Sequence, residues 1–184
     1  MSLATAIPSS RSTTNEAHLV PPPPRHAVRA AYAAAASATI GFLPLHVIWA
    51  LGIPLFADPD LFRPWYQDGG GVYLLTLNLL ALLPAVLAVA LIRPWGLVFP
   101  RWVPIVRGHR VPRMLLIAPG AALSGFLLAY TAFAAVLMPL QWDDPAAIFD
   151  PRTGIYGIAQ FLVWIAGLAI ATRSYACRTR PNAS

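Results

Sequence analysis

Four stretches of this 184-residue sequence contain no Asp, Glu, Lys or Arg, and they constrain the fold more than any other feature. They cover residues 30–56, 72–92, 114–140 and 155–172, and the shortest has 18 residues. Because a helix rises about 1.5 Å per residue, each stretch has the roughly 17 to 25 residues needed to cross a hydrocarbon core of about 30 Å. The sequence therefore predicts an all-α fold, a four-helix transmembrane bundle.

The composition agrees with a membrane protein. Hydrophobic residues make up 58% of the chain and charged residues 11%, whereas soluble domains average about 25% charged residues. A water-soluble globule of this size needs more polar surface than these counts supply. The single cysteine, Cys177, excludes an intramolecular disulfide and a Cys-x-x-Cys motif.

The N-terminal residues differ from the rest of the chain. Residues 1–29 are rich in Ser, Thr, Ala and Pro and have no apolar periodicity, so we expect a disordered tail before a membrane domain at 30–180. The apolar stretch that follows is longer than the core of about 7 to 15 residues in a cleavable signal. All basic residues are Arg and Ala is the commonest residue, which favours a GC-rich bacterial source.

The arginines predict the orientation. Eleven of them lie in the tail, in 93–113 and after 172, while only Arg63 and Arg152 accompany six aspartates in the loops 57–71 and 141–154. Basic residues near span ends stay on the cytoplasmic side. We therefore expect a multi-pass protein of a bacterial plasma membrane with both termini cytoplasmic.

The cytoplasmic segment 93–113 is expected to lie on the lipid surface. Its four prolines exclude a continuous helix. Arginines and tryptophans close to a span end are typical of contact with anionic headgroups. The expected headgroup ligands are Arg93, Arg101, Arg107, Arg110 and Arg113.

The two acidic loops, 57–71 and 141–154, carry Trp65, Tyr66 and Trp142 and are expected to pack together over the mouth of the bundle. Their aspartates are typical of a solvated acidic face. Binding of a cation or a cationic ligand is the alternative.

A few side chains within the spans can form hydrogen bonds, and these are the candidate ligand-binding residues. Each span contributes at least one such group, and helical rise places them in the outer half of the membrane. One interpretation is that they only tie helices together, through bonds worth about 0.6 kcal/mol each. The other is that they line a cavity. The candidates are His46, Trp49, Asn78, Tyr130, Thr131 and Gln160.

Helical phase supports an inward position for Gln160, whose neighbours one and two turns away include Tyr156, Trp164 and Gly167. The corresponding neighbours of His46 are mostly apolar and leave its direction open. Imidazole is the group here that exchanges protons near neutral pH. Haem would need a second histidine in a span, and a metal would need thiolates or carboxylates there, so we expect no metal and no cofactor.

Small residues four apart predict close helix packing. The pairs do not by themselves distinguish packing within the bundle from packing between copies of the chain, and the first is the simpler interpretation. The pairs are Ser37–Gly41, Gly120–Ser124, Ala121–Gly125 and Gly167–Ala171.

Several short motifs resemble those of a known family. They are His46-Val-Ile-Trp49-Ala50-Leu51-Gly52, Arg93-Pro94-Trp95-Gly96, Pro100-Arg101-Trp102 and Arg110-Val111-Pro112. The chain is similar in these motifs to an uncharacterised family of small four-span actinobacterial integral membrane proteins, a domain of unknown function. The resemblance implies a four-helix fold, and it does not indicate any particular activity.

These observations favour a non-enzymatic protein that binds or helps to move a small lipophilic molecule in an outward-facing cavity around His46. The first alternative is a structural accessory subunit, with a membrane-complex partner or a second copy of the chain. The second is a membrane-embedded enzyme in which His46 is the acid or base and Tyr130 or Asn78 holds the substrate. The expected partners are anionic lipid and a lipophilic small molecule, not nucleic acid.

Overall fold

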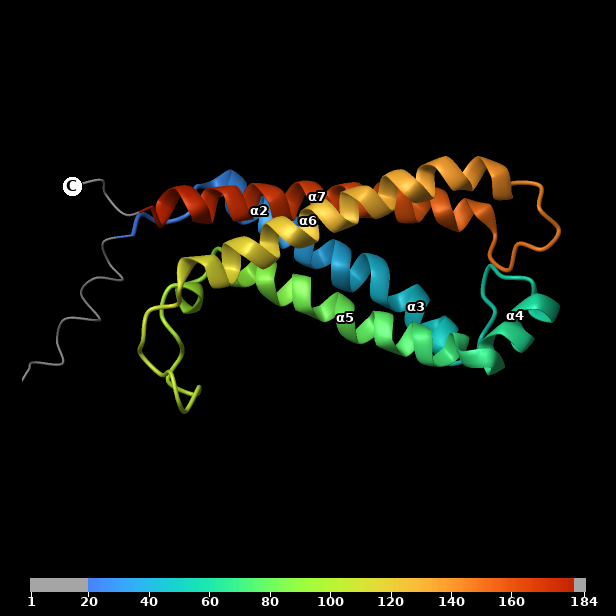
Figure 1. The fold of residues 1–184 in the computed structure, drawn as a ribbon, viewed down its shortest axis with the longest axis horizontal. Helices are drawn as coiled ribbons and strands as arrows, with labels where there is room; N and C mark the ends of the chain where they lie inside the picture. Colours follow the sequence, from blue (N-terminus) through green and yellow to red (C-terminus); the bar gives the residue numbers. More distant parts are fainter. Residues whose placement is uncertain (1–19, 181–184) are drawn as a thin grey trace, which may run out of the picture.

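The computed structural model describes residues 20–180. Residues 1–19 of the tail expected at 1–29 lie outside the described residues. Four helices are long and apolar enough to cross a membrane, which confirms the all-α, four-span fold (Figure 1). They cover Arg25–Ala50, Pro59–Ala90, Arg113–Gln141 and Pro151–Arg178. The first of them begins at Arg25, within the segment expected as tail.

Three of the spans are built from shorter elements, and the fourth is the single helix α7. The first joins α2 (Arg25–Ala36), the π-helix η1 (Ser37–Phe42) and α3 (Leu43–Ala50). A short helix, α4 (Pro59–Trp65), and the turn η2 (Tyr66–Gly70) precede α5 (Gly71–Ala90). The remaining elements are η3 (Pro94–Gly96), α6 (Arg113–Leu137), η4 (Met138–Gln141) and α7 (Pro151–Arg178).

Local chemistry explains two boundaries that differ from the expected ones. The first helix ends at Ala50 rather than at residue 56, because Gly52 has a φ of +80° and Pro54 follows it. The loop expected at 57–71 contains α4, which Asp58 caps by accepting hydrogen bonds from the backbone of Asp60 and Leu61. Gly69, at φ +102°, turns the chain into α5.

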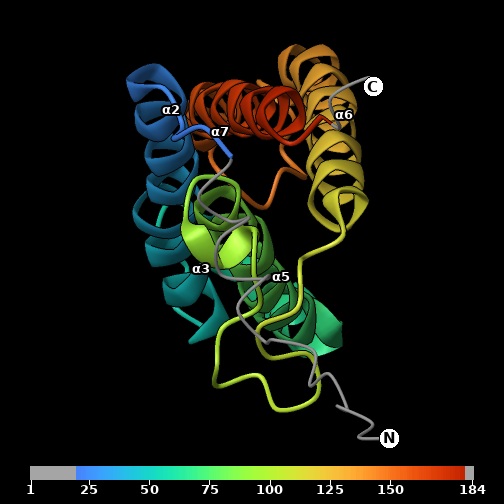
Figure 2. The ribbon, with the colours of Figure 1, turned by 90° about the vertical axis from the view of Figure 1, so that its left-hand side faces the viewer.

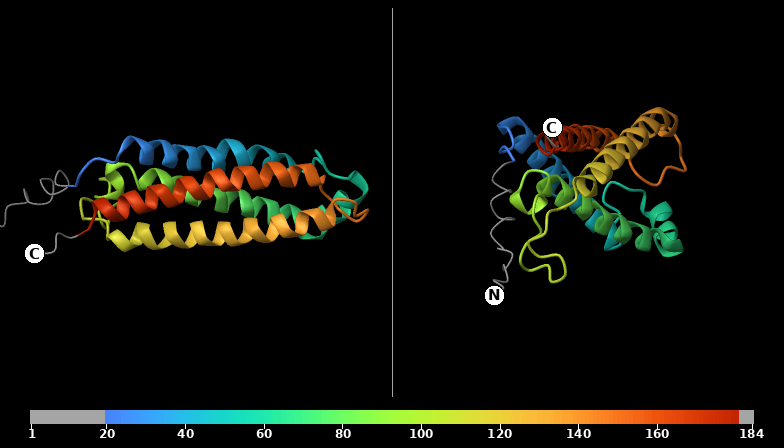
Figure 3. Two further views of the ribbon diagram at one scale, coloured as in Figure 1. Left: turned by 90° about the horizontal axis from the view of Figure 1, so that it is seen from above. Right: turned by 60° about the vertical axis from the view of Figure 1, so that its left-hand side comes forward.

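Helix α7 is the centre of the bundle and packs on both α2 and α6. Helix α5 packs on α2 and α3, and touches α6 over a smaller area near one end (Figures 1 and 2). From that end α5 and α6 diverge along the bundle (Figure 3).

Alanines contribute about half of the main core, and many large apolar residues lie on the surface. Ala31, Ala34, Ala85, Ala88 and Ala171 are buried in the main core. Leucines, valines and phenylalanines of α5 and α6 face outward and are exposed. Close alanine packing inside with an apolar exterior is the pattern of helices that associate in lipid.

Three of the small-residue pairs pack within the chain. Gly41 lies against Gln160, Gly120 against Thr172, and Gly167 against Ala30 and Ala34. The intramolecular interpretation is therefore confirmed for these pairs. The fourth pair differs, because a Cβ at Gly125 would meet nothing within 4 Å.

The two ends of the bundle differ in the charged residues that they carry. We call the end that carries Arg25, Arg93, Arg113 and Arg178 the basic end. There the Tyr175 hydroxyl donates to the Gly96 carbonyl at 2.8 Å. Two backbone carbonyls, of Leu91 and Pro21, accept hydrogen bonds from the Arg178 guanidinium. Such bonds satisfy carbonyls that the end of α5 leaves without helical partners.

The opposite, acidic end is closed by the loops 51–58 and 142–150. They form an antiparallel bridge between Ala57 and Phe149, with a backbone hydrogen bond on either side. The expected packing of the two acidic loops is therefore confirmed.

Candidate functional site

The side chains predicted to bind a ligand lie on all four spans, and the structure brings only part of the set together. His46 and Trp49 are on α3, with ring centroids 5.1 Å apart. Asn78 is on α5, on the buried face that also carries Leu74 and Ala81. The remaining candidates are Tyr130 and Thr131 on α6 and Gln160 on α7.

His46 and Asn78 lie at the same level of the bundle. Trp49 and Leu74 belong to one buried cluster, and Phe42 and Ala81 to another. On the first span, His46 lies between Phe42 and Trp49. On the adjacent, antiparallel α5, Asn78 lies between Leu74 and Ala81. These positions place His46 and Asn78 at a similar depth along the bundle.

The His46 ring is held by its own helix. Its Nδ1 is 2.9 Å from the carbonyl oxygen of Phe42, and the two rings are stacked with centroids 3.6 Å apart. Because a carbonyl oxygen can only accept, the neutral imidazole carries its proton on Nδ1. Its Nε2 is therefore an acceptor for a partner outside the helix.

Asn78 is a buried amide in the second span. Its side chain is 7% exposed, and neither the amide nitrogen nor the amide oxygen has a hydrogen-bond partner among the described residues. The indole nitrogen of the buried Trp164 is also without a partner in the same part of the chain. Leaving an amide unpaired in an apolar environment costs on the order of 2 kcal/mol or more.

Gln160 and its neighbours are fully used in packing. The Gln160 amide donates to the carbonyl of Ser37 at 2.9 Å, and the Ser37 hydroxyl donates to the carbonyl of Gln160 at 2.8 Å. The Tyr156 hydroxyl donates to the carbonyl of Gly41. The carbonyls of Ser37 and Gly41 lie in η1, where the helix widens to a π-helical turn. Pro44, at the start of α3, has no N–H for the carbonyl of Ile40. Side chains of α7 thus satisfy carbonyls that this irregular turn exposes.

The two α6 candidates do not join the site directly. Thr131 is buried, but its hydroxyl donates to the Leu127 carbonyl of its own helix. Tyr130 is 46% exposed, and its ring contacts Phe161 at a centroid distance of 5.8 Å.

A row of aromatic rings connects Tyr130 to His46, and sequence reasoning missed it. Tyr130 contacts Phe161, Phe161 contacts Phe42, and Phe42 stacks on His46. Trp49 continues the row to Phe149 of the loop 142–150, at 4.5 Å. Phe42 is one helical turn before His46, and this spacing could have indicated that single contact. Phe161 directly follows Gln160 and has no such signal.

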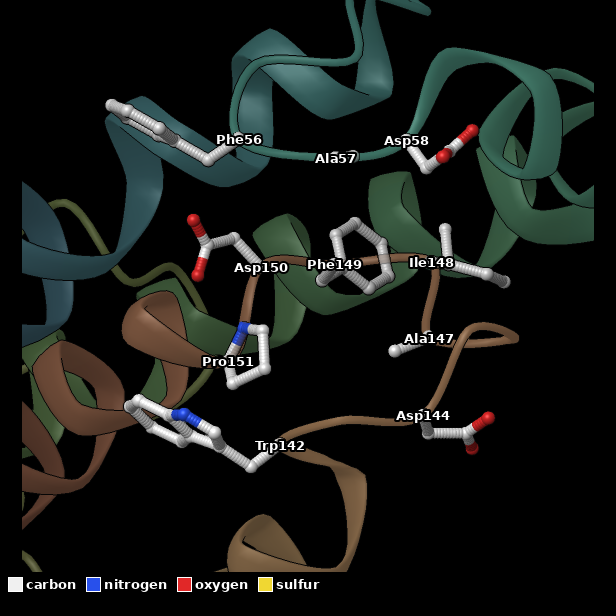
Figure 4. Close-up of a pocket in the computed structure, with 10 residues that line it drawn as sticks. All are labelled: Phe56, Ala57, Asp58, Trp142, Asp144, Ala147, Ile148, Phe149, Asp150 and Pro151. Atoms are coloured by element: carbon white, nitrogen blue, oxygen red, sulfur yellow. The ribbon is translucent and has the colours of Figure 1, made fainter.

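A second feature is a shallow pocket of about 320 Å³ at the acidic end, where the two loops meet (Figure 4). It is lined by Phe56, Trp142 and three aspartates. Each aspartate accepts a hydrogen bond from a nearby backbone N–H, so the three carboxylates act as turn and helix caps. The capping aspartates are Asp58, Asp144 and Asp150.

No group of three or more His, Cys, Asp or Glu within 20–180 is placed to hold a metal ion. The expected headgroup arginines divide into two kinds. Arg93 donates to the Tyr32 hydroxyl and Arg113 to the Ala176 carbonyl, so both are tied to the bundle. Arg101 and Arg107 are exposed on the loop between α5 and α6.

Comparison with protein-family models, with curated proteins and with solved structures finds no significant match for this chain. What the protein does is therefore inferred from its own residues.

Proposed function

We propose that this is a multi-pass protein of a bacterial plasma membrane that binds a small lipophilic molecule inside the bundle, between His46 and Asn78. In this proposal the basic end is cytoplasmic, as the arginine distribution predicts. The observation that carries the binding proposal is the buried Asn78 amide without a partner, at the level of an imidazole whose Nε2 accepts.

The chemistry of the two side chains selects a ligand class. The Asn78 amide offers both a donor and an acceptor, while His46 offers an acceptor through Nε2. A hydroxyl group matches both, because it donates to the imidazole and accepts from the amide. A lipophilic alcohol is therefore the expected ligand, with its chain against the aromatic row of Phe42, Phe161 and Tyr130.

A polar side chain inside a membrane span supports a binding role when it forms no hydrogen bond within the bundle. Gln160, Ser37 and Thr131 are all used by hydrogen bonds within the bundle. Asn78 is not, although an amide in a span is costly unless paired.

The test uses dodecanol and its methyl ether as probes on the purified full-length protein. Dodecanol can donate a hydrogen bond and the ether cannot, while their chains are nearly identical. We expect dodecanol to raise the melting temperature in detergent and the ether to have no comparable effect, since a ligand that binds only the folded state stabilises it. Equal shifts with both probes would show nonspecific partitioning and contradict the proposal.

Variants locate the effect. Asn78→Leu is expected to abolish the dodecanol shift while raising the ligand-free stability by about 1 to 3 kcal/mol, because it removes an unpaired buried amide. His46→Leu is expected to abolish the shift as well. Thr76→Val is the matched control, since Thr76 is an exposed polar residue of the same helix that bonds only to the Val72 carbonyl. A dodecanol shift that survives in Asn78→Leu would leave the structural accessory subunit as the better interpretation.

A further inference from the structure

The connection between α5 and α6 is folded as a small hairpin, which we call the basic hairpin (97–111). The backbone N–H of Phe99 donates to the carbonyl of His109, and the N–H of Val111 donates to the carbonyl of Leu97. Gly108, at φ +73°, supplies the left-handed residue that the turn needs.

The base of the hairpin is fixed to the bundle. Leu97 packs on the main core, and Val111 is buried. The preceding residue, Gly96, accepts the hydrogen bond from Tyr175 and has no room for a side chain against the Ala90 carbonyl. The direction of the hairpin is therefore determined by the helices that carry it.

The tip of the hairpin is apolar and faces away from the protein. Trp102 is 81% exposed and Ile105 is 89% exposed. Arg101 and Arg107 flank them. No Asp or Glu occurs from residue 93 to residue 142, so every charged side chain in this part of the sequence is an arginine.

The hairpin extends sideways from the bundle. In Figures 1 and 2 it leaves the basic end across the long axis of the helices and stays at the level where α5 ends and α6 begins. For a bundle that spans a membrane, this is the level of the headgroups on that side.

We propose that the basic hairpin inserts Trp102 and Ile105 into the anionic leaflet at the basic end, with Arg101 and Arg107 on lipid phosphates. Exposed Trp and Ile together are unfavourable in water, whereas an indole is most stable at the membrane interface. Positive charge beside them matches the phosphates of anionic lipid. The hairpin is thus an interfacial anchor that holds the bundle at a fixed depth.

The test measures depth with a nitroxide label in the full-length protein. Cys177→Ser removes the native thiol, and Ile105→Cys places the label at the tip. Two references use the same background: Leu83→Cys, which is exposed on α5 in the middle of a span, and Asp143→Cys in an acidic loop. Vesicles contain phosphatidylcholine with or without phosphatidylglycerol.

With phosphatidylglycerol present, we expect the label at 105 to collide with oxygen more than with a water-soluble nickel chelate, as at position 83. A label at 105 that behaves like the one at 143 would overturn the insertion. We expect Arg101→Gln with Arg107→Gln to bring the label toward the aqueous phase and to remove the effect of phosphatidylglycerol. Equal depth in both vesicle types with the arginines intact would overturn their role. Melting temperature is expected to stay unchanged in all these variants, since the tip makes no contact with the bundle that the described residues show.

Discussion

Two hydrogen bonds between Ser37 and Gln160 run in opposite directions and hold the π-helical turn η1 on α7. Each donor is a side chain and each acceptor is a backbone carbonyl. In lipid no water replaces a lost partner, so the carbonyl of Ser37 depends on the Gln160 amide. The pair therefore fixes the axial position of the first span against the last.

This pair gives a prediction at the residue scale. Gln160→Leu is expected to lower the free energy of unfolding by about 0.6 to 1.7 kcal/mol, the range measured for hydrogen bonds between membrane helices. Ser37→Ala is expected to cost a similar amount. Thermal melting in detergent measures both, with Thr76→Val as a control that removes a hydroxyl bonded only within its own helix. If the control is destabilised as much as Gln160→Leu, the interhelical bond has no special role.

Helical phase was most informative where one face of a span differs clearly from the others. It indicated an interior face for Gln160, and that side chain contacts η1. It left His46 open, because the neighbours one helical turn away are mostly apolar, among them Phe42 and Trp49, which its ring contacts. The aromatic row could not be predicted, since Phe161 and Phe42 meet only after α7 packs on the first span.

At the scale of elements, the length of the uncharged stretches predicts the number of spans but not which spans pack against each other. Which helices touch depends on where glycine and alanine permit close approach, as at Gly167 on α7, which lies against Ala30 and Ala34 of α2. The π-helical turn has a partial signal in Pro44, which removes one backbone donor. Whether a proline kinks, ends or widens a helix depends on the tertiary partners of that turn, and here Tyr156 and Gln160 of α7 donate to the carbonyls of Gly41 and Ser37.

The contact at Gly167 gives a prediction for the packing of α2 on α7. A Cβ at this position would collide with the carbonyl of Ala30 and lie 2.9 Å from the Cβ of Ala34. Gly167→Ala is therefore expected to destabilise the protein by about 1 to 3 kcal/mol through overpacking. Gly157→Ala is the matched control on the same helix, because a Cβ there meets nothing within 4 Å.

The control is expected to be neutral or slightly stabilising, by up to about 1 kcal/mol, since alanine has the better helix propensity. Both variants are compared by thermal melting in the same detergent. Equal stability of the two proteins would show that α2 and α7 can separate without cost, and would contradict the close packing.

At the scale of the whole molecule, the two ends of the bundle carry opposite charge. Different interactions hold the segments together at each end. Backbone pairing joins the loops at the acidic end. Arginine and tyrosine side chains bonded to carbonyls join the helices at the basic end. The site proposed between His46 and Asn78 lies along the bundle between these two closures.

The charge difference between the ends predicts the orientation in the membrane. Arginines near the span ends are retained on the cytoplasmic side, whereas the aspartate-rich loops cross easily. A phosphatase that is active only outside the cytoplasm is expected to be inactive when fused after Ser184, and active when inserted after Asp144 in the loop 142–150. A fluorescent protein that folds only in the cytoplasm is expected to show the reverse at the same two positions. Phosphatase activity after Ser184 would place the basic end outside, and the basic hairpin would then meet the outer leaflet instead of the cytoplasmic one.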